Sequence, residues 1–112
     1  MAATYEDAKI FMDLVRWSTE MGLSEALNEI YAPDFDASDG SFESPAVWKV
    51  LAFGETLGTL VKHNLLDWDL VSDMFWIKGM WRQVGAHARF VRENEGEPAL
   101  YEHFESLAAR VA

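Results

Sequence analysis

The sequence predicts an all-α fold, a compact bundle of four to five helices with short connections and one acidic loop. Apolar residues recur at helical spacing along most of the chain, and no stretch shows the alternating pattern of a strand. Half of the residues are hydrophobic and five are tryptophan, which is enough apolar material for one packed core. With 112 residues, we expect a single domain spanning 1–112.

The first two helices are expected over residues 5–21 and 24–32. Thr4 can cap the first, with Asp7 three residues later near the positive end of the helix, and Gly22 suits its C-terminal exit. The first helix has one apolar arc, made of Ile10, Phe11, Leu14, Val15, Trp17 and Met21. In the second helix, Tyr31 is expected to face inward and a proline follows the last turn.

The dipeptide Ser44-Pro45 predicts the start of a third helix, which should continue to about His63, because a capping serine precedes proline at the first helical position. Its inward arc contains two glycines one turn apart, Gly54 and Gly58. Glycine on a buried helical face lowers helix stability, so we expect the closest helix–helix contact of the fold there.

Asp67 can cap a further helix that runs to about Asn94, with Gly79 or Gly85 as the position of a kink. A glycine and a proline then interrupt the helical pattern, and the last helix is expected over residues 98–111.

The segment 74–94 carries more than one arc. Its first apolar arc belongs to the core, and a second, nearly opposite arc mixes aromatic and polar residues: Trp76, Gln83, His87 and Phe90. A third arc is a basic stripe: Lys78, Arg82 and Arg89. Either the helix is central and both apolar arcs are buried, which the burial tendencies favour, or the second arc faces a partner or ligand.

Glu55 lies at the margin of the buried arc of the third helix. If its carboxylate is buried it needs a charged partner, for which Arg89 is one candidate and Arg82 the other. A structural ion pair between Glu55 and Arg89 is favoured over acid–base catalysis by Glu55.

Residues 33–43 form an acidic loop that contains Asp34, Asp36, Asp39 and Glu43. A helix–loop–helix calcium site needs glycine at its sixth position and glutamate at its twelfth. Counted from Asp34, these positions hold Asp39 and Pro45, so we expect a solvated loop without a metal. The histidines lack zinc-ligand spacing and cysteine is absent, so no metal and no cofactor is expected.

The net charge of −10 is concentrated in residues 1–43, which hold ten acidic and two basic residues. Such a chain should repel phosphates, so neither direct nucleic-acid binding nor membrane binding is expected. The absence of cysteine and of a signal peptide at the N-terminus favours a cytoplasmic protein.

Three segments resemble an uncharacterised group of small all-helical bacterial domains. They are residues 53–61, residues 66–71, and Trp81 with Arg89 and residues 101–107. The resemblance covers about the last two-thirds of the chain and implies a helical domain without an assigned activity.

We expect a non-enzymatic interaction module that forms a homodimer through its aromatic helix face, or that binds a basic protein through its acidic first third. One alternative is an acidic inhibitor or nucleic-acid mimic whose loop carboxylates imitate phosphates. Another is a small-molecule binder with a cavity among five residues: Trp48, Trp76, Trp81, His87 and Phe90. An enzyme is unsupported, because no nucleophile, base and orienting acid occur together.

Overall fold

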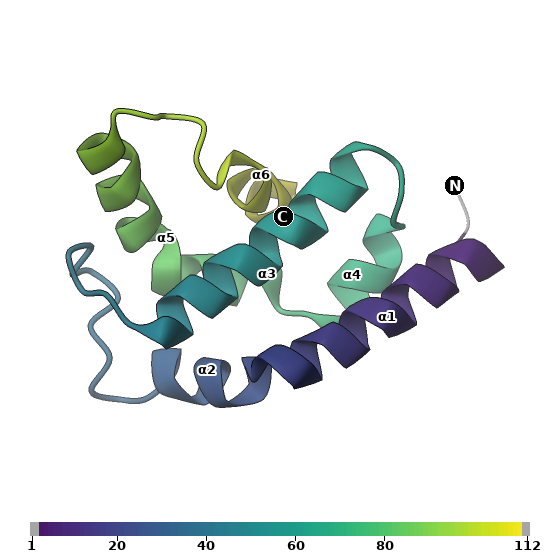
Figure 1. The fold of residues 1–112 in the computed structure, drawn as a ribbon, viewed down its shortest axis with the longest axis horizontal. Helices are drawn as coiled ribbons and strands as arrows, with labels where there is room; N and C mark the ends of the chain where they lie inside the picture. Colours follow the sequence, from purple (N-terminus) through teal and green to yellow (C-terminus); the bar gives the residue numbers. More distant parts are fainter. Residues whose placement is uncertain (1–2, 111–112) are drawn as a thin grey trace.

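The computed structural model describes residues 3–110, which fold into α-helices connected by turns and contain no strand (Figure 1). The helices are α1 (Tyr5–Met21), α2 (Leu23–Ile30), α3 (Pro45–Lys62), α4 (Trp68–Met74), α5 (Ile77–Glu95) and α6 (Glu102–Arg110). The all-α expectation is confirmed, although the described residues form six helices rather than four to five. None of these six is long and apolar enough to cross a membrane.

The start and end of α1 follow from local chemistry. Thr4 and Asp7 form a reciprocal capping box: the Asp7 N–H donates to the Thr4 hydroxyl (3.1 Å) and the Thr4 N–H to the Asp7 carboxylate (2.8 Å). Gly22, with φ of +78°, ends α1 and directly precedes α2. Both ends of the expected first helix are therefore confirmed.

Helix α3 runs through the middle of the molecule, between α2 and α6 (Figure 1). The Ser44 hydroxyl accepts the N–H of Val47, as the start signal predicts. The side chains of α3 provide much of the core, and four of them are completely buried: Val50, Leu51, Phe53 and Leu57.

The two glycines of α3 mark the contact with α6. A Cβ atom on Gly54 would collide with the ring of Phe104, and one on Gly58 would collide with the backbone carbonyl of His103. Only glycine, which lacks a Cβ atom, fits at these two positions unless α6 moves. The expectation of a close helix contact at Gly54 and Gly58 is confirmed.

The segment 67–94 is broken into two helices, where one kinked helix was expected. Phe75 is extended (φ −117°, ψ 136°), and α5 begins only after Trp76. Phe75 packs against Phe11 and Phe53, with ring centroids 6.0 and 5.1 Å apart, whereas Trp76 lies on the other side of the chain against Tyr31. Extended backbone sends successive side chains to opposite sides, which a helix would not do.

The expected kink positions have other roles, and the last helix begins late. Gly79 leaves room for the Trp76 ring, and Gly85 faces the Trp81 ring. Residues 98–101 form a turn in which Tyr101 has a φ of +61°, so α6 starts at Glu102 rather than at residue 98. The expected end of this helix at residue 111 lies outside the described residues.

Candidate functional site

The outer arc of α5, made of Trp76, Gln83, His87 and Phe90, is covered in its middle and exposed at its ends. The Gln83 amide donates to the carbonyl of Ile30 (2.7 Å), and His87 Nδ1 lies 2.8 Å from the carbonyl oxygen of Gly40. His87 is only 3% exposed, whereas Trp76 is 59% and Phe90 38% exposed. The arc is therefore neither entirely buried, as the first alternative expects, nor entirely exposed.

His87 attaches the acidic loop to α5. Because the Gly40 carbonyl can only accept, Nδ1 carries the proton, and Nε2 is left buried without a hydrogen-bond partner. The imidazole also stacks on Phe90, with ring centroids 6.1 Å apart. Gly40 itself lies directly against the Ala86 carbonyl, where a Cβ would collide. The role of His87 in this geometry is to hold the loop.

An exposed stack forms at the N-terminal end of α5, which we call the Trp76 cluster: Tyr31, Trp76 and Arg82. The Tyr31 and Trp76 rings are stacked, with centroids 5.9 Å apart, and the Arg82 guanidinium lies 4.9 Å from the centre of the indole. Burial raises the pKa of Tyr31, and the nearby positive charge of Arg82 partly opposes this shift. The expectation that Tyr31 faces inward is wrong, since it is 37% exposed.

The acidic loop, residues 33–43, is held by two successive local turns. Asp36 accepts from the N–H and hydroxyl of Ser38 (3.0 and 2.6 Å), and Asp39 accepts in the same way from Ser41 (3.1 and 2.6 Å). The hydrogen bonds from Ser38 lower the pKa of Asp36. All four acidic residues of the loop are exposed, and within residues 3–110 none of them forms an ion pair: Asp34, Asp36, Asp39 and Glu43.

These features lie along one helix. The Trp76 cluster stands at the start of α5, and the loop meets α5 at Ala86 and Phe90, which are about 15 and 21 Å beyond Trp76 at the helical rise per residue. The residues of the basic stripe are exposed: Lys78, Arg82 and Arg89. One of them, Arg82, reaches the Trp76 ring. The loop and the C-terminal part of α5 lie at the same end of the long axis (Figure 1).

The aromatic residues expected to enclose a cavity diverge. Trp81 packs edge-on against Phe104 of α6 (5.1 Å), on the side of α5 opposite to Trp76. Trp48, on α3, is 56% exposed. These rings therefore do not surround a common space. No group of three metal-ligating side chains occurs within residues 3–110 either.

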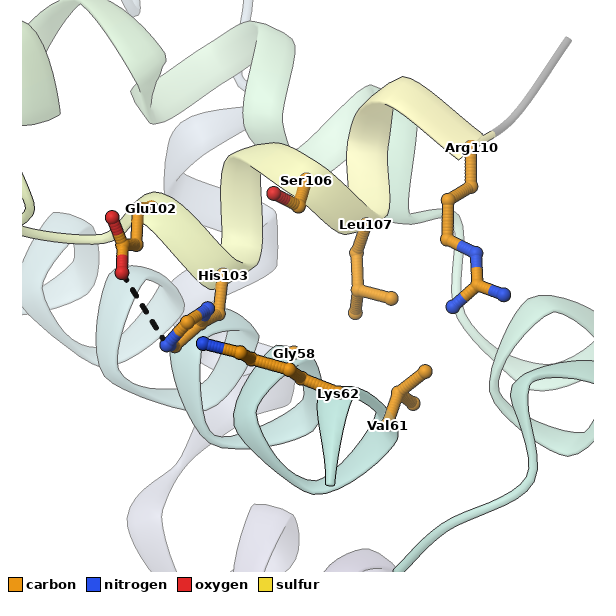
Figure 2. A pocket seen from close by; sticks show the side chains of 8 residues that line it. All are labelled: Gly58, Val61, Lys62, Glu102, His103, Ser106, Leu107 and Arg110. Carbon is orange, nitrogen blue, oxygen red and sulfur yellow. Dashed lines mark ion pairs between the residues drawn. The ribbon is translucent and has the colours of Figure 1, made fainter. Parts of the chain in front are cut away.

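A groove of about 500 Å³ lies between the C-terminal end of α3 and α6 (Figure 2). Its buried floor includes Val61 and Leu107. Its polar lining is provided by Lys62, Glu102, His103, Ser106 and Arg110. The sequence offered no signal for this groove, since its residues are dispersed over two helices and belong to no motif.

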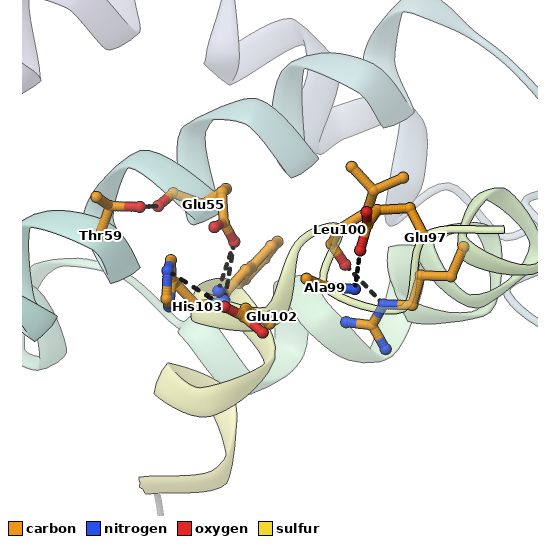
Figure 3. Close-up of polar contacts among 9 residues, drawn as sticks. Glu55, Thr59, Glu97, Ala99, Leu100, Glu102 and His103 are labelled. Carbon is orange, nitrogen blue, oxygen red and sulfur yellow. Dashed lines mark hydrogen bonds and ion pairs between the residues drawn. The ribbon is translucent and has the colours of Figure 1, made fainter. Parts of the chain in front are cut away.

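Glu55 caps α6 instead of pairing with Arg89. Its carboxylate oxygen Oε1 accepts the backbone N–H groups of His103 (3.0 Å) and Phe104 (2.9 Å) (Figure 3). Arg89 is exposed, and no ion pair joins Glu55 to Arg89 or Arg82 within residues 3–110. The positive end of a helix thus takes the place of the expected arginine.

Arg92, which the sequence did not single out, completes the junction between α5 and α6. Its Nε donates to the Leu100 carbonyl (2.6 Å), and its guanidinium pairs with Glu105 (3.0 Å) and lies over the Trp81 ring (5.8 Å). Arg92 and Glu55 hold α6 from two sides. Both residues are structural in this geometry.

Comparison with known proteins gives one result at the level of the family. No curated protein and no solved structure matches the chain significantly. A family model described as "Domain of unknown function (DUF4760)" matches residues 4–111, so the match includes the acidic first third that the resemblance left out. The chain therefore belongs to this uncharacterised family.

Proposed function

We propose that this protein is a non-enzymatic interaction module that pairs with a second copy of itself through the outer face of α5. One observation carries the proposal: an exposed aromatic–arginine stack adjoins the start of α5, and an exposed acidic loop contacts the same helix further along, at Ala86 and Phe90. Trp76, at 59% exposure, is the largest side chain on that face. Tryptophan, tyrosine and arginine are the residues that most often dominate binding energy at protein interfaces.

The face is self-complementary in an antiparallel arrangement. A twofold axis through the middle of α5 would bring the Lys78 and Arg82 side chains of one copy to the acidic loop of the other, and the reverse contact would form by symmetry. The second copy then supplies the basic partner that the acidic loop is expected to favour. Each copy carries a net charge of −10, so this local complementarity and the aromatic contact have to outweigh an overall repulsion.

The chain offers a matched control for this surface. Trp48 is a tryptophan of nearly the same exposure, 56%, but it lies on α3 and outside the Trp76 cluster. Replacing Trp76 by alanine removes the largest apolar contact of the proposed interface, whereas replacing Trp48 by alanine removes a similar area elsewhere.

Sedimentation equilibrium over a range of protein concentrations tests the proposal. We expect the wild type and Trp48→Ala to form dimers, and Trp76→Ala and Phe90→Arg to dissociate at least about 30-fold more readily. Circular dichroism should show that all variants keep their helical content. A wild type that stays monomeric, or equal losses in Trp48→Ala and Trp76→Ala, would refute the proposal.

A further inference from the structure

The groove between α3 and α6 is lined by more basic than acidic side chains, in a chain that is acidic overall. Lys62, His103 and Arg110 line it, and Glu102 is the one acidic residue in its wall. Figure 2 shows the Lys62 side chain extending toward the His103 ring and the Arg110 guanidinium projecting from the end of α6. Basic side chains from two helices thus line a single hollow.

Lys62 and Arg110 also line a neighbouring hollow together with four acidic residues, which lie at distances longer than those of an ion pair: Glu6, Asp7, Asp67 and Asp69. Within residues 3–110, neither Lys62 nor Arg110 forms an ion pair, although acidic residues outnumber basic ones about two to one in the sequence. Arg110 is held by stacking on Trp68, 5.2 Å from the ring centre, which limits its freedom before any ligand arrives. Glu102 contacts His103 (3.6 Å) and forms no ion pair with Lys62 or Arg110.

The floor of the groove indicates the size and polarity of a molecule that could bind there. Val61 and Leu107 are buried apolar side chains at its base, and Gly58 lets the α6 backbone approach α3 closely at one end. A volume of about 500 Å³ lies in the range of small-molecule sites. An apolar floor with basic groups around it suits a molecule with one anionic group and a compact apolar body.

We infer that the groove between α3 and α6 binds a small organic anion, a carboxylate or a phosphate monoester on an apolar body about the size of an aromatic ring. The charges of Lys62 and Arg110, toward opposite ends of the groove, attract the anionic group, Ser106 offers a hydroxyl donor, and the apolar body lies over Val61 and Leu107. Its lining shares no residue with the Trp76 cluster or the acidic loop, so this inference does not depend on self-association.

Backbone amide chemical-shift mapping with benzoate and phenyl phosphate tests this inference, with benzyl alcohol as the neutral analogue. We expect saturable shifts centred on residues 58–62 and 102–110 for both anions and none for benzyl alcohol. Lys62→Gln and Arg110→Gln should each weaken binding about three- to tenfold, because each loses one solvent-accessible charged contact.

The control is Lys49→Gln, which removes the same charge from the same helix but lies outside the groove. It should leave the affinity within about twofold of the wild type. Equal weakening by Lys49→Gln and Lys62→Gln, binding of benzyl alcohol as tight as that of the anions, shifts centred on another surface, or no shifts at millimolar anion would each overturn the inference. The test is done at protein concentrations below those that favour self-association. A negative result for anion binding is therefore distinct from a negative result for dimer formation.

Discussion

The carboxylate of Glu55 on α3 accepts the backbone N–H of Phe104 at 2.9 Å, and the same oxygen accepts the preceding N–H of His103. These two donors belong to the first turn of α6. A residue nearly fifty positions away in the sequence therefore supplies the N-terminal cap of the last helix. The cap fixes the position at which α6 meets the two glycines of α3.

Replacement of Glu55 should destabilise the fold in proportion to the lost cap. Glu55→Ala should lower the free energy of unfolding by about 1–2 kcal/mol, because two partly buried N–H groups lose their acceptor. Glu55→Gln keeps an acceptor oxygen and loses only the charge, so we expect about 0.5–1 kcal/mol. Urea unfolding measures both. The exposed Glu20→Ala on α1 is the control and should change stability by less than about 0.5 kcal/mol.

Replacing Gly54 or Gly58 by alanine should lower the stability of the fold, whereas the same change at an ordinary helical glycine raises it. Glycine-to-alanine changes inside a helix usually stabilise by up to about 1 kcal/mol. Here the added Cβ would collide with α6, so we expect a loss of about 1–3 kcal/mol in thermal or urea unfolding. Gly58→Ala should be the worse of the two, since it meets the His103 backbone rather than a side-chain ring. A gain in stability at either position would mean that α6 does not pack there.

Replacement of His87 by alanine should release the acidic loop from α5. The variant loses the hydrogen bond to the Gly40 carbonyl and the contact with Phe90, while the turns centred on Asp36 and Asp39 remain. We expect faster amide exchange and easier proteolysis within residues 33–43, with α5 still helical. Gln83→Ala, which frees the end of α2 instead, should leave exchange in the loop close to that of the wild type.

The Trp76 cluster should be visible in the titration of Tyr31. Burial raises the folded-state pKa of Tyr31 above its ordinary value of 10.0, and Arg82 opposes this, so Arg82→Gln should raise that pKa further. The stabilising contribution of protonated Tyr31 is therefore complete below pH 10.0 and lost as the pH rises through the folded pKa. Nuclear magnetic resonance of the tyrosine rings, with Tyr31→Phe for assignment, measures the shift. A lower pKa of Tyr31 in Arg82→Gln would contradict the placement of Arg82 beside Tyr31 in the Trp76 cluster.

Local signals in the sequence predict much of this fold. The Thr4 capping box, the Ser44-Pro45 start and the glycine pair of α3 each act over a few residues, so they can be read without the rest of the chain. The break at Phe75 could not be predicted, because it depends on Phe11 and Phe53, which only the fold brings together. The cap by Glu55 depends in the same way on distant residues. The outer arc of α5 was identified, but its division into a covered middle and exposed ends depends on where the acidic loop returns.

The most direct test of self-association is an exchange of charges between the two ends of the α5 face. One variant carries Asp34→Lys and Glu43→Lys, which leaves Asp36 and Asp39 and their turns intact. A second variant carries Lys78→Glu and Arg82→Glu. Sedimentation velocity is measured on each variant alone and on an equimolar mixture. Antiparallel pairing predicts that each variant alone is monomeric and that the mixture forms a heterodimer, because opposite charges then meet at both contacts. If the mixture remains monomeric while the wild type dimerises, or if either variant pairs with itself as the wild type does, the proposed face is contradicted.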